Sequence, residues 1–205
     1  MAAISSYEFP AVGWTSNFGG MSGFSMSESV DELNEPPIRR DYIRVMARYN
    51  SQQNEALIRC CGDLTDAQRK TDCGAFFRSI HETFSHLIWA DRIWLYRLGA
   101  LPPPKISGLS ASTHWSDDWA ELVAAREGTD RELIEWADTV SDELLSRDVE
   151  WYSEAAERTI IRSVPLILMH LFNHQAHHRG QIHAMVTRLG GLGYVTDLAI
   201  LDLES

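Results

Sequence analysis

The stretch HLFNHQAHHRGQ, residues 170–181, holds four of the eight histidines in this chain of 205 residues. It lies in a longer segment, about 164–189, where apolar residues recur every three or four positions until the sequence GGLG. This periodicity and the glycines after it predict an amphipathic helix. At about 100° per residue, His174 and His178 fall within the apolar face of that helix.

His174 and His178 lie four positions apart, so a helix places them one turn apart on the same side, where two imidazoles can chelate one metal ion. Imidazoles that point into a protein interior also need polar partners. The pair lacks the glutamate of the HExxH pattern, so it does not indicate a metalloprotease. His170 and His177 lie at the edge of the apolar face, and we expect His183 on the surface.

A metal site in a helical protein usually takes ligands from facing helices, so a third ligand is expected from elsewhere in the chain. The segment 72–98 supplies two candidates, His81 and His86. Periodicity alone does not choose between them, because they flank the apolar stripe on opposite sides by a similar angle. His114 lies in a proline-rich loop and is the weaker candidate, since a loop ligand needs its own support.

Three further segments show helical periodicity, namely 38–62, 72–98 and 117–141. Together with 164–189 they predict an all-α fold in which four long helices form a bundle. The weakly alternating segment 147–162 predicts an irregular connection with at most a short hairpin.

The same patterns predict the core faces and one helix start. The apolar stripe of the first helix includes Tyr42 and Val45, and that of the second includes Phe76. Ser116 is followed by acidic residues and is the predicted N-cap of the third helix.

Composition limits the function classes. The net charge of −11 and the isoelectric point near 5.1 disfavour a nucleic-acid partner, since phosphates would be repelled. No apolar run reaches the roughly 20 residues needed to cross a bilayer, and residues 1–38 have no Lys or Arg for a secretory leader. Cys60, Cys61 and Cys73 are a poor basis for a disulfide framework. We therefore expect a cytoplasmic protein with no membrane partner.

The chain divides into a tail and one domain. Residues 1–37 are rich in serine and glycine, lack sustained periodicity and end at a Pro-Pro pair. We expect an N-terminal extension that is either flexible or docked on the domain or on a neighbouring subunit. Residues 38–205 are long enough for one well-packed domain.

Three segments resemble the DinB/YfiT-like family of metal-dependent proteins. They are YNSQQNEAL (49–57), SIHETFSHLIWADRIWLYRL (79–98) and LMHLFNHQAHHRGQIHAM (168–185). The resemblance extends over residues 38–203 and implies a four-helix bundle of up-down-down-up topology that is usually a homodimer.

The resemblance also implies a divalent metal ion held by one histidine of the second long helix and two of the last. By position these are His86, His174 and His178. His81 and Arg179 then become possible pocket residues without an assigned catalytic role. Three neutral histidines leave a coordination position open, which is typical of catalytic sites. Imidazole ligands suit several metals, and we expect zinc first and nickel second.

For this family the resemblance implies metal-dependent transfer or isomerisation reactions that use a low-molecular-weight thiol. We expect an S-transferase-like enzyme that joins such a thiol to a small electrophilic substrate. One alternative is a metal-dependent hydrolase that uses metal-bound hydroxide. Another is a non-catalytic, stress-associated metal-binding protein.

Asn173 and Asp91 are expected to orient the metal-binding histidines through hydrogen bonds.

Overall fold

The computed structural model describes residues 38–154 and 156–202, and within them the chain is mostly helical. Four long helices dominate, namely α1 (Arg40–Gly62), α3 (Ile80–Arg97), α4 (Trp119–Thr139) and α6 (Val164–Arg188). The short elements are α2 (Asp66–Arg69), α5 (Asp142–Leu145) and the 3-10 turns η2 (Leu109–Ala111) and η3 (Leu198–Ile200). The tail expected over residues 1–37 lies outside the described residues. In the described part of the chain, no helix is long and apolar enough to cross a membrane.

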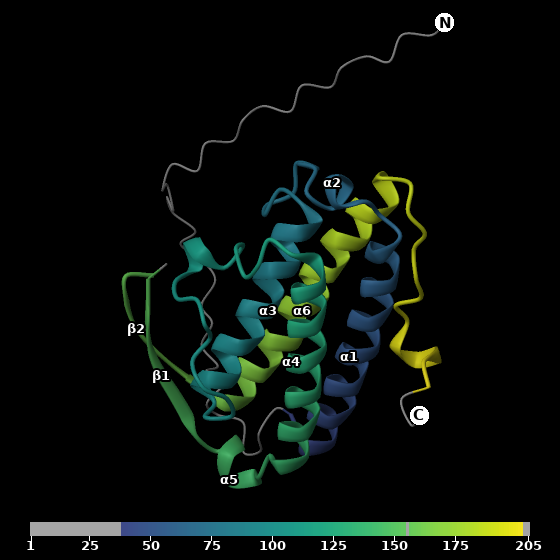
Figure 1. Cartoon of the computed structure of the whole chain (residues 1–205). Coiled ribbons are helices and arrows are strands. Elements are labelled where there is room, and N and C mark those ends of the chain that lie inside the picture. Colours follow the sequence, from purple (N-terminus) through teal and green to yellow (C-terminus); the bar gives the residue numbers. More distant parts are fainter. Residues whose placement is uncertain (1–37, 155, 203–205) are drawn as a thin grey trace, which may run out of the picture. The chain divides into compact units, whose positions relative to one another are not determined.

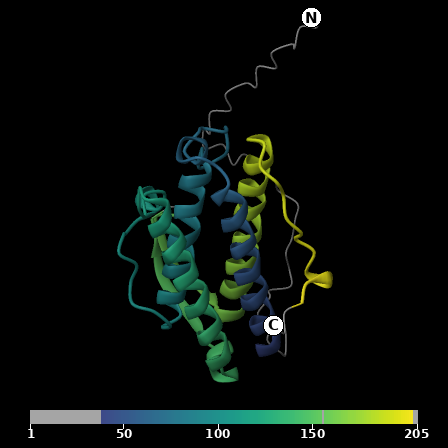
Figure 2. The same ribbon diagram turned by 45° about the vertical axis from the view of Figure 1, so that its right-hand side comes forward.

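Side-chain contacts give the relative directions of neighbouring helices. Arg44, near the start of α1, pairs with Asp138, near the end of α4, at 3.2 Å, and further along Asn54 bonds to Asp130. These two helices are therefore antiparallel. Figures 1 and 2 show all four long helices side by side, with α1 and α6 running in one direction and α3 and α4 in the other.

Helices α3 and α6 are also antiparallel, and this pair carries most of the histidines. His86 meets His174, while Trp94, later in α3, meets His170, earlier in α6. Pro165 sits in the first turn of α6, where its missing N–H costs nothing. The helix extends to Arg188 as the sequence predicts.

Two antiparallel strands, β1 (Asp148–Ser153) and β2 (Arg158–Ser163), form a small sheet just before α6. Their register runs from Asp148 opposite Ser163 to Ser153 opposite Arg158. Alternate residues of β1 are half-buried, and Trp151 packs edge-on against Trp94 of α3 at 5.2 Å between ring centroids. The all-α prediction was therefore incomplete, because this hairpin is a regular sheet.

Helix α3 begins at Ile80 rather than at Asp72, so the predicted start was wrong. Two residues of the preceding segment, Gly74 and Arg78, have positive φ angles of 73° and 63°, which a right-handed helix cannot contain. Phe76 lies in this turn with 81% of its surface exposed, so its predicted place in the core was also wrong.

The N-cap of α4 is Asp118, whose carboxylate accepts the backbone N–H of Glu121 at 2.9 Å. Ser116, the predicted cap, instead accepts the N–H of Asp118 and donates to the carboxylate of Glu121. The helix runs through Gly128 without interruption.

The face that α1 buries includes the predicted Leu57 but differs near the start of the helix. Tyr42 and Val45 are 38% and 42% exposed. The buried face mixes apolar and amide side chains, because α4 and α6 offer charged partners there. Its members include Ile43, Ala47, Asn50, Asn54, Leu57 and Cys61.

The segment after α6 returns along α1, as the yellow trace in Figure 1 shows. The hydroxyl of Tyr49 in α1 donates to the carbonyl of Thr196 at 2.7 Å. The ring of His183 stacks on Tyr194 with 4.6 Å between centroids. His183 is therefore half-buried rather than a plain surface residue.

A buried ion cluster joins α3 and α4. The guanidinium of Arg126 is fully buried and lies 2.8 Å from a carboxylate oxygen of Asp91 and 2.9 Å from one of Asp130. Asn54 of α1 donates to Asp130 at 2.9 Å. Burial raises the pKa of Asp130, which Arg126 and Asn54 counteract by stabilising its charged form.

Replacing Arg126 should therefore destabilise the fold. Arg126→Met would leave two carboxylates buried without a cation, and we expect a loss of about 3–5 kcal/mol in the free energy of unfolding. Urea denaturation measures this, with Arg59→Met as control, because the pair of Arg59 with Glu55 is exposed and contributes less than about 1 kcal/mol. Equal stabilities of the two variants would contradict the assignment.

Candidate metal centre

Three histidines converge between α3 and α6. His86 projects from α3, and His174 and His178 project from successive turns of α6. Their ring centroids lie 5.1 Å (His86–His174), 5.0 Å (His86–His178) and 4.4 Å (His174–His178) apart. One nitrogen from each ring lies within 4.8 Å of the other two, with His86 and His178 buried and His174 half-buried.

These nitrogens fit the spacing that a shared cation requires. The Nε2 atoms of His86 and His174 are 3.2 Å apart. Two nitrogens bound at 2.0–2.1 Å to one tetrahedral ion would be roughly 3.3 Å apart. No fourth His, Cys, Asp or Glu from the described residues joins the group. The three histidines could therefore hold a metal ion without closing its coordination shell.

Ser112 fixes the orientation of His86. The Nδ1 atom of His86 lies 2.9 Å from the hydroxyl oxygen of Ser112, which is fully buried beside η2. With its Nδ1–H donated to this oxygen, the ring keeps the lone pair on Nε2, which faces His174. A hydrogen bond of this kind orients the imidazole ring for metal binding. Ser112 lies in a loop without periodicity, so no pattern in the sequence pointed to it.

Gln181 does the same for His178. Its carbonyl oxygen lies 2.8 Å from Nδ1 of His178, and because that oxygen only accepts, Nδ1 carries the proton. Its amide nitrogen lies 3.1 Å from Nε2 of the exposed His177. The Nε2 atom of His178 is thereby left as a free lone pair.

Burial keeps the three rings neutral. It lowers the pKa of His86 to about 3 and that of His174 to about 2, with smaller contributions from neighbouring histidines. Burial also lowers the pKa of His178, although the hydrogen bond to Gln181 opposes this effect. Neutral imidazoles have the lone pairs that a cation needs.

The other predicted histidines lie outside the group of three. His81 is buried, and its Nε2 bonds to the backbone carbonyl of Ser116 at 2.8 Å, which ties α3 to the segment before α4. His114 is exposed in its loop. His170 and His177 are exposed and flank the group, with ring centroids 5.5 Å from His174 and 4.8 Å from His178 respectively.

The hydrogen bonds and ion pairs of Arg179, Asn173 and Asp91 go to residues other than the three histidines. Arg179 is buried toward α1, where it donates to the side-chain carbonyls of Asn50 and, at 3.2 Å, Gln175. Asn173 is exposed and donates to the carbonyl of Met169. Asp91 pairs with Arg126. Arg179 therefore contributes to helix packing. The hydrogen bonds to the metal-binding histidines that the sequence predicts for Asn173 and Asp91 are made instead by Ser112 and Gln181.

A cavity of about 520 Å³ opens beside the histidines, a volume suited to a small molecule. His86 and His174 form part of its wall, so an ion held there would be reachable from the cavity. The remaining lining comes from α3, from β1 and the residue after it, from α6, and from the start of η2 with the glycine before it. These residues are Trp89, Ala90, Ile93, Trp94, Arg97, Gly108, Leu109, Trp151, Tyr152, Ser153, Glu154 and His170.

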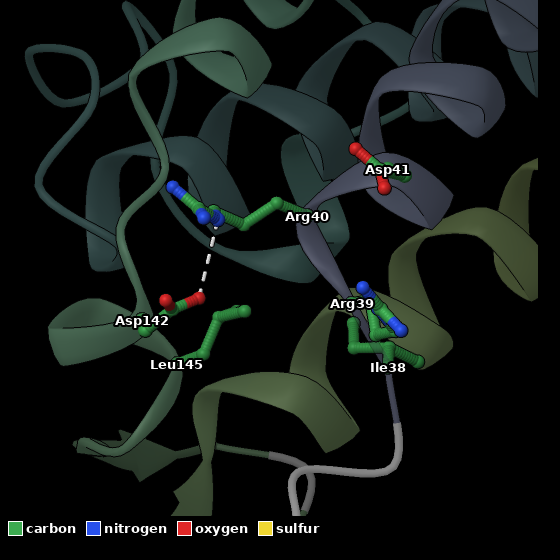
Figure 3. Close-up of a pocket in the computed structure, with 6 residues that line it drawn as sticks. All are labelled: Ile38, Arg39, Arg40, Asp41, Asp142 and Leu145. Carbon is green, nitrogen blue, oxygen red and sulfur yellow. Dashed lines mark ion pairs between the residues drawn. The ribbon is translucent and has the colours of Figure 1, made fainter.

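A second, smaller hollow of about 160 Å³ lies at the start of α1 and contains no histidine. Figure 3 shows its lining, in which Arg40 of α1 forms an ion pair with Asp142 of α5 at 3.2 Å. Because the group of metal-ligating side chains found in the described residues is the one beside the larger cavity, we regard the histidine-lined cavity as the candidate functional site.

Comparison with known proteins agrees with this fold. The sequence profile of the DinB family matches residues 26–201, and the chain therefore belongs to the DinB family. A crystal structure of a DinB-like protein from Bacillus cereus ATCC 10987 is similar in fold, with a TM-score of 0.53 and 18% identity. The similarity covers 70% of this chain and 89% of that one. No curated protein matches the sequence.

The buried neutral histidines predict acid sensitivity of the metal-free protein. At pH values below about 6.5 these side chains become protonated in the unfolded chain, whereas His86 and His174 stay neutral in the folded one. Stability should be constant with respect to these groups above pH 6.5. Below pH 6.5, each of these two histidines should lower the free energy of unfolding by up to about 1.4 kcal/mol for every unit by which the pH falls.

Urea denaturation in the presence of a chelator at pH 7.5 and 5.5 checks this, with His86→Gln as the matched variant. The variant should lose less stability between the two pH values than the natural chain. An equal loss would contradict the burial of a neutral His86.

The hydrogen bond from Gln181 predicts a second effect. Gln181→Ala removes the acceptor that orients His178, and we expect zinc affinity to fall about 10- to 100-fold. Competition with a chromophoric chelator measures the affinity. Asn173→Ala is the control on the same helix, since Asn173 contacts only a backbone carbonyl. Affinities within twofold of each other would contradict the role of Gln181.

Proposed function

We propose that this chain is a metal-dependent DinB-family enzyme in which His86, His174 and His178 bind one divalent ion, zinc first and nickel second. The proposed reaction joins a low-molecular-weight thiol to a small electrophilic substrate. The observation that carries the proposal is the convergence of three neutral imidazoles, with no fourth ligand from the described residues, at the wall of a cavity of about 520 Å³.

The chemistry follows from the donor set. When bound, a divalent ion with a free position acts as a Lewis acid and stabilises a thiolate or hydroxide there. The chain's own residues prepare that position. Ser112 orients the ring of His86, and the carbonyl oxygen of Gln181 accepts the Nδ1–H of His178. The aromatic lining, including Trp89, restricts water around the reacting groups.

In the proposed transfer, the thiolate sulfur forms a bond to the electrophilic carbon of the substrate. The thiol proton passes to solvent, and the leaving group departs with the electron pair of the broken bond. His170 also lines the cavity, with its ring centroid 5.5 Å from that of His174, so it can contact such a substrate.

We also propose the organisation implied by the family resemblance. Residues 1–37 would be an N-terminal extension to one domain formed by residues 38–205, acting as a cytoplasmic homodimer. The four long helices would form the up-down-down-up bundle of the family. The antiparallel contacts of α1 with α4 and of α3 with α6 support that topology.

A conjugation assay tests the reaction. The zinc-loaded protein is mixed with 1-chloro-2,4-dinitrobenzene and, in turn, with bacillithiol, mycothiol and glutathione. We expect conjugation with at least one thiol, its loss on chelation and its return with zinc. Turnover of an ester substrate without any thiol would instead favour the hydrolase. No metal-dependent conjugation with any of the three thiols would count against the transferase.

The histidine assignment is tested by His178→Ala, with His177→Ala as the matched neighbour outside the group. We expect His178→Ala to lose bound zinc and to lower activity roughly 100-fold or more, since removing a ligand costs more than removing its hydrogen-bond partner. His177→Ala should keep its zinc. Elemental analysis and the conjugation rate check both variants, and full zinc content in His178→Ala would contradict the site.

A further inference from the structure

One face of α3 forms the floor of an elongated groove. The residues of this helix that line the cavity are spaced by one, three or four positions, so they lie on one side of the helix. They are His86, Trp89, Ala90, Ile93, Trp94 and Arg97. At 1.5 Å per residue, Arg97 lies about 16 Å along the helix from His86. Strand β1 and α6 contribute the walls. The cavity thus has the histidine group at one end and Arg97 at the other.

Arg97 is a half-buried cation without an anionic partner among the described residues. Its guanidinium lies over the rings of Trp94 and Trp151, at 4.6 and 5.2 Å from their centroids. Stacking of this kind uses the faces of the guanidinium and leaves its N–H groups, which point outward in its plane, free to donate. Burial alone lowers its pKa, and an arginine remains protonated at neutral pH.

The charges at the two ends of the groove differ. Among the described lining residues, Glu154 is the one carboxylate, and its side chain lies next to Gly108. Gly108 belongs to the segment that leads to Ser112. Ser112 in turn contacts His86, so Glu154 belongs to the histidine end. In the metal-free protein, the carboxylate head of a ligand would be repelled by Glu154 at the histidine end and attracted by Arg97 at the opposite end.

Between the two ends the lining is apolar and aromatic. Trp89, Ile93 and Trp94 come from α3, while Trp151 and Tyr152 come from β1. An apolar ligand body loses water on entering such a lining, which favours binding. Aromatic rings in the ligand can also stack on the indoles.

We propose that this groove binds an elongated carboxylate with an apolar or aromatic body, whose carboxylate is held by Arg97 and whose opposite end lies at the histidines. The guanidinium fork matches two carboxylate oxygens, which makes Arg97 the specificity-determining residue. The reactive role of the histidine end rests on the proposed function. The anchoring of the carboxylate by Arg97 needs no metal.

Binding to the full-length, chelator-treated protein tests the anchor. The probes are 8-phenyloctanoate and its uncharged analogue 8-phenyloctan-1-ol, followed by the change in tryptophan fluorescence. We expect the carboxylate to bind at least about tenfold more tightly than the alcohol. Arg97→Met should weaken carboxylate binding about 10- to 100-fold, because a hydrogen bond to a charged group contributes about 1.5–3 kcal/mol. Its affinity for the alcohol should change little.

Arg131→Met is the control, since Arg131 is exposed on α4 and does not line the groove. Arg97→Lys keeps the positive charge but loses the two parallel N–H donors of the guanidinium, so it should weaken carboxylate binding roughly 3- to 10-fold. This variant provides the test if Arg97→Met does not fold. Equal affinity for both probes, or unchanged carboxylate binding in the Arg97 variants, would overturn the proposal. The zinc content of each variant before chelation shows separately whether the metal site is intact.

Discussion

The antiparallel packing of α3 against α6 is the constraint on which the site depends. It sets one histidine of α3 opposite two successive turns of α6, so that imidazoles far apart in sequence share one small volume. Burying neutral imidazoles is costly unless their nitrogens find partners. In His86 and His178 one nitrogen faces a protein acceptor, and the other faces the common point. This division of roles distinguishes a prepared binding site from a merely polar patch.

The same motif supplies both the site and the packing around it. In HHRGQ, residues 177–181, His178 faces the histidine group and Gln181 orients it, whereas Arg179 turns toward α1. There it meets amide side chains, and the nearby ion cluster of Arg126 continues the polar interior between α1, α3 and α4. Buried charges of this kind are satisfied only in one helix arrangement, which helps to hold the three histidines in register.

Much of this could be predicted from the sequence, and the limits have physical causes. Periodicity located four helices, and the resemblance selected His86 over His81, whose imidazole instead bonds to a backbone carbonyl. Two kinds of feature could not be predicted from the sequence. The start of α3 depends on left-handed residues at 74 and 78, which apolar spacing does not reveal. Ser112 acts through a tertiary contact from a loop, and the polar face of α1 depends on partners in other helices.

The central claim is that three imidazoles share one cation and leave part of its shell free. Zinc K-edge X-ray absorption of the zinc-loaded, full-length protein tests it most directly. We expect three imidazole nitrogens at about 2.0–2.1 Å from the zinc and one further light scatterer from solvent. A first shell containing sulfur, a fourth imidazole, or fewer than three imidazoles per zinc would contradict it.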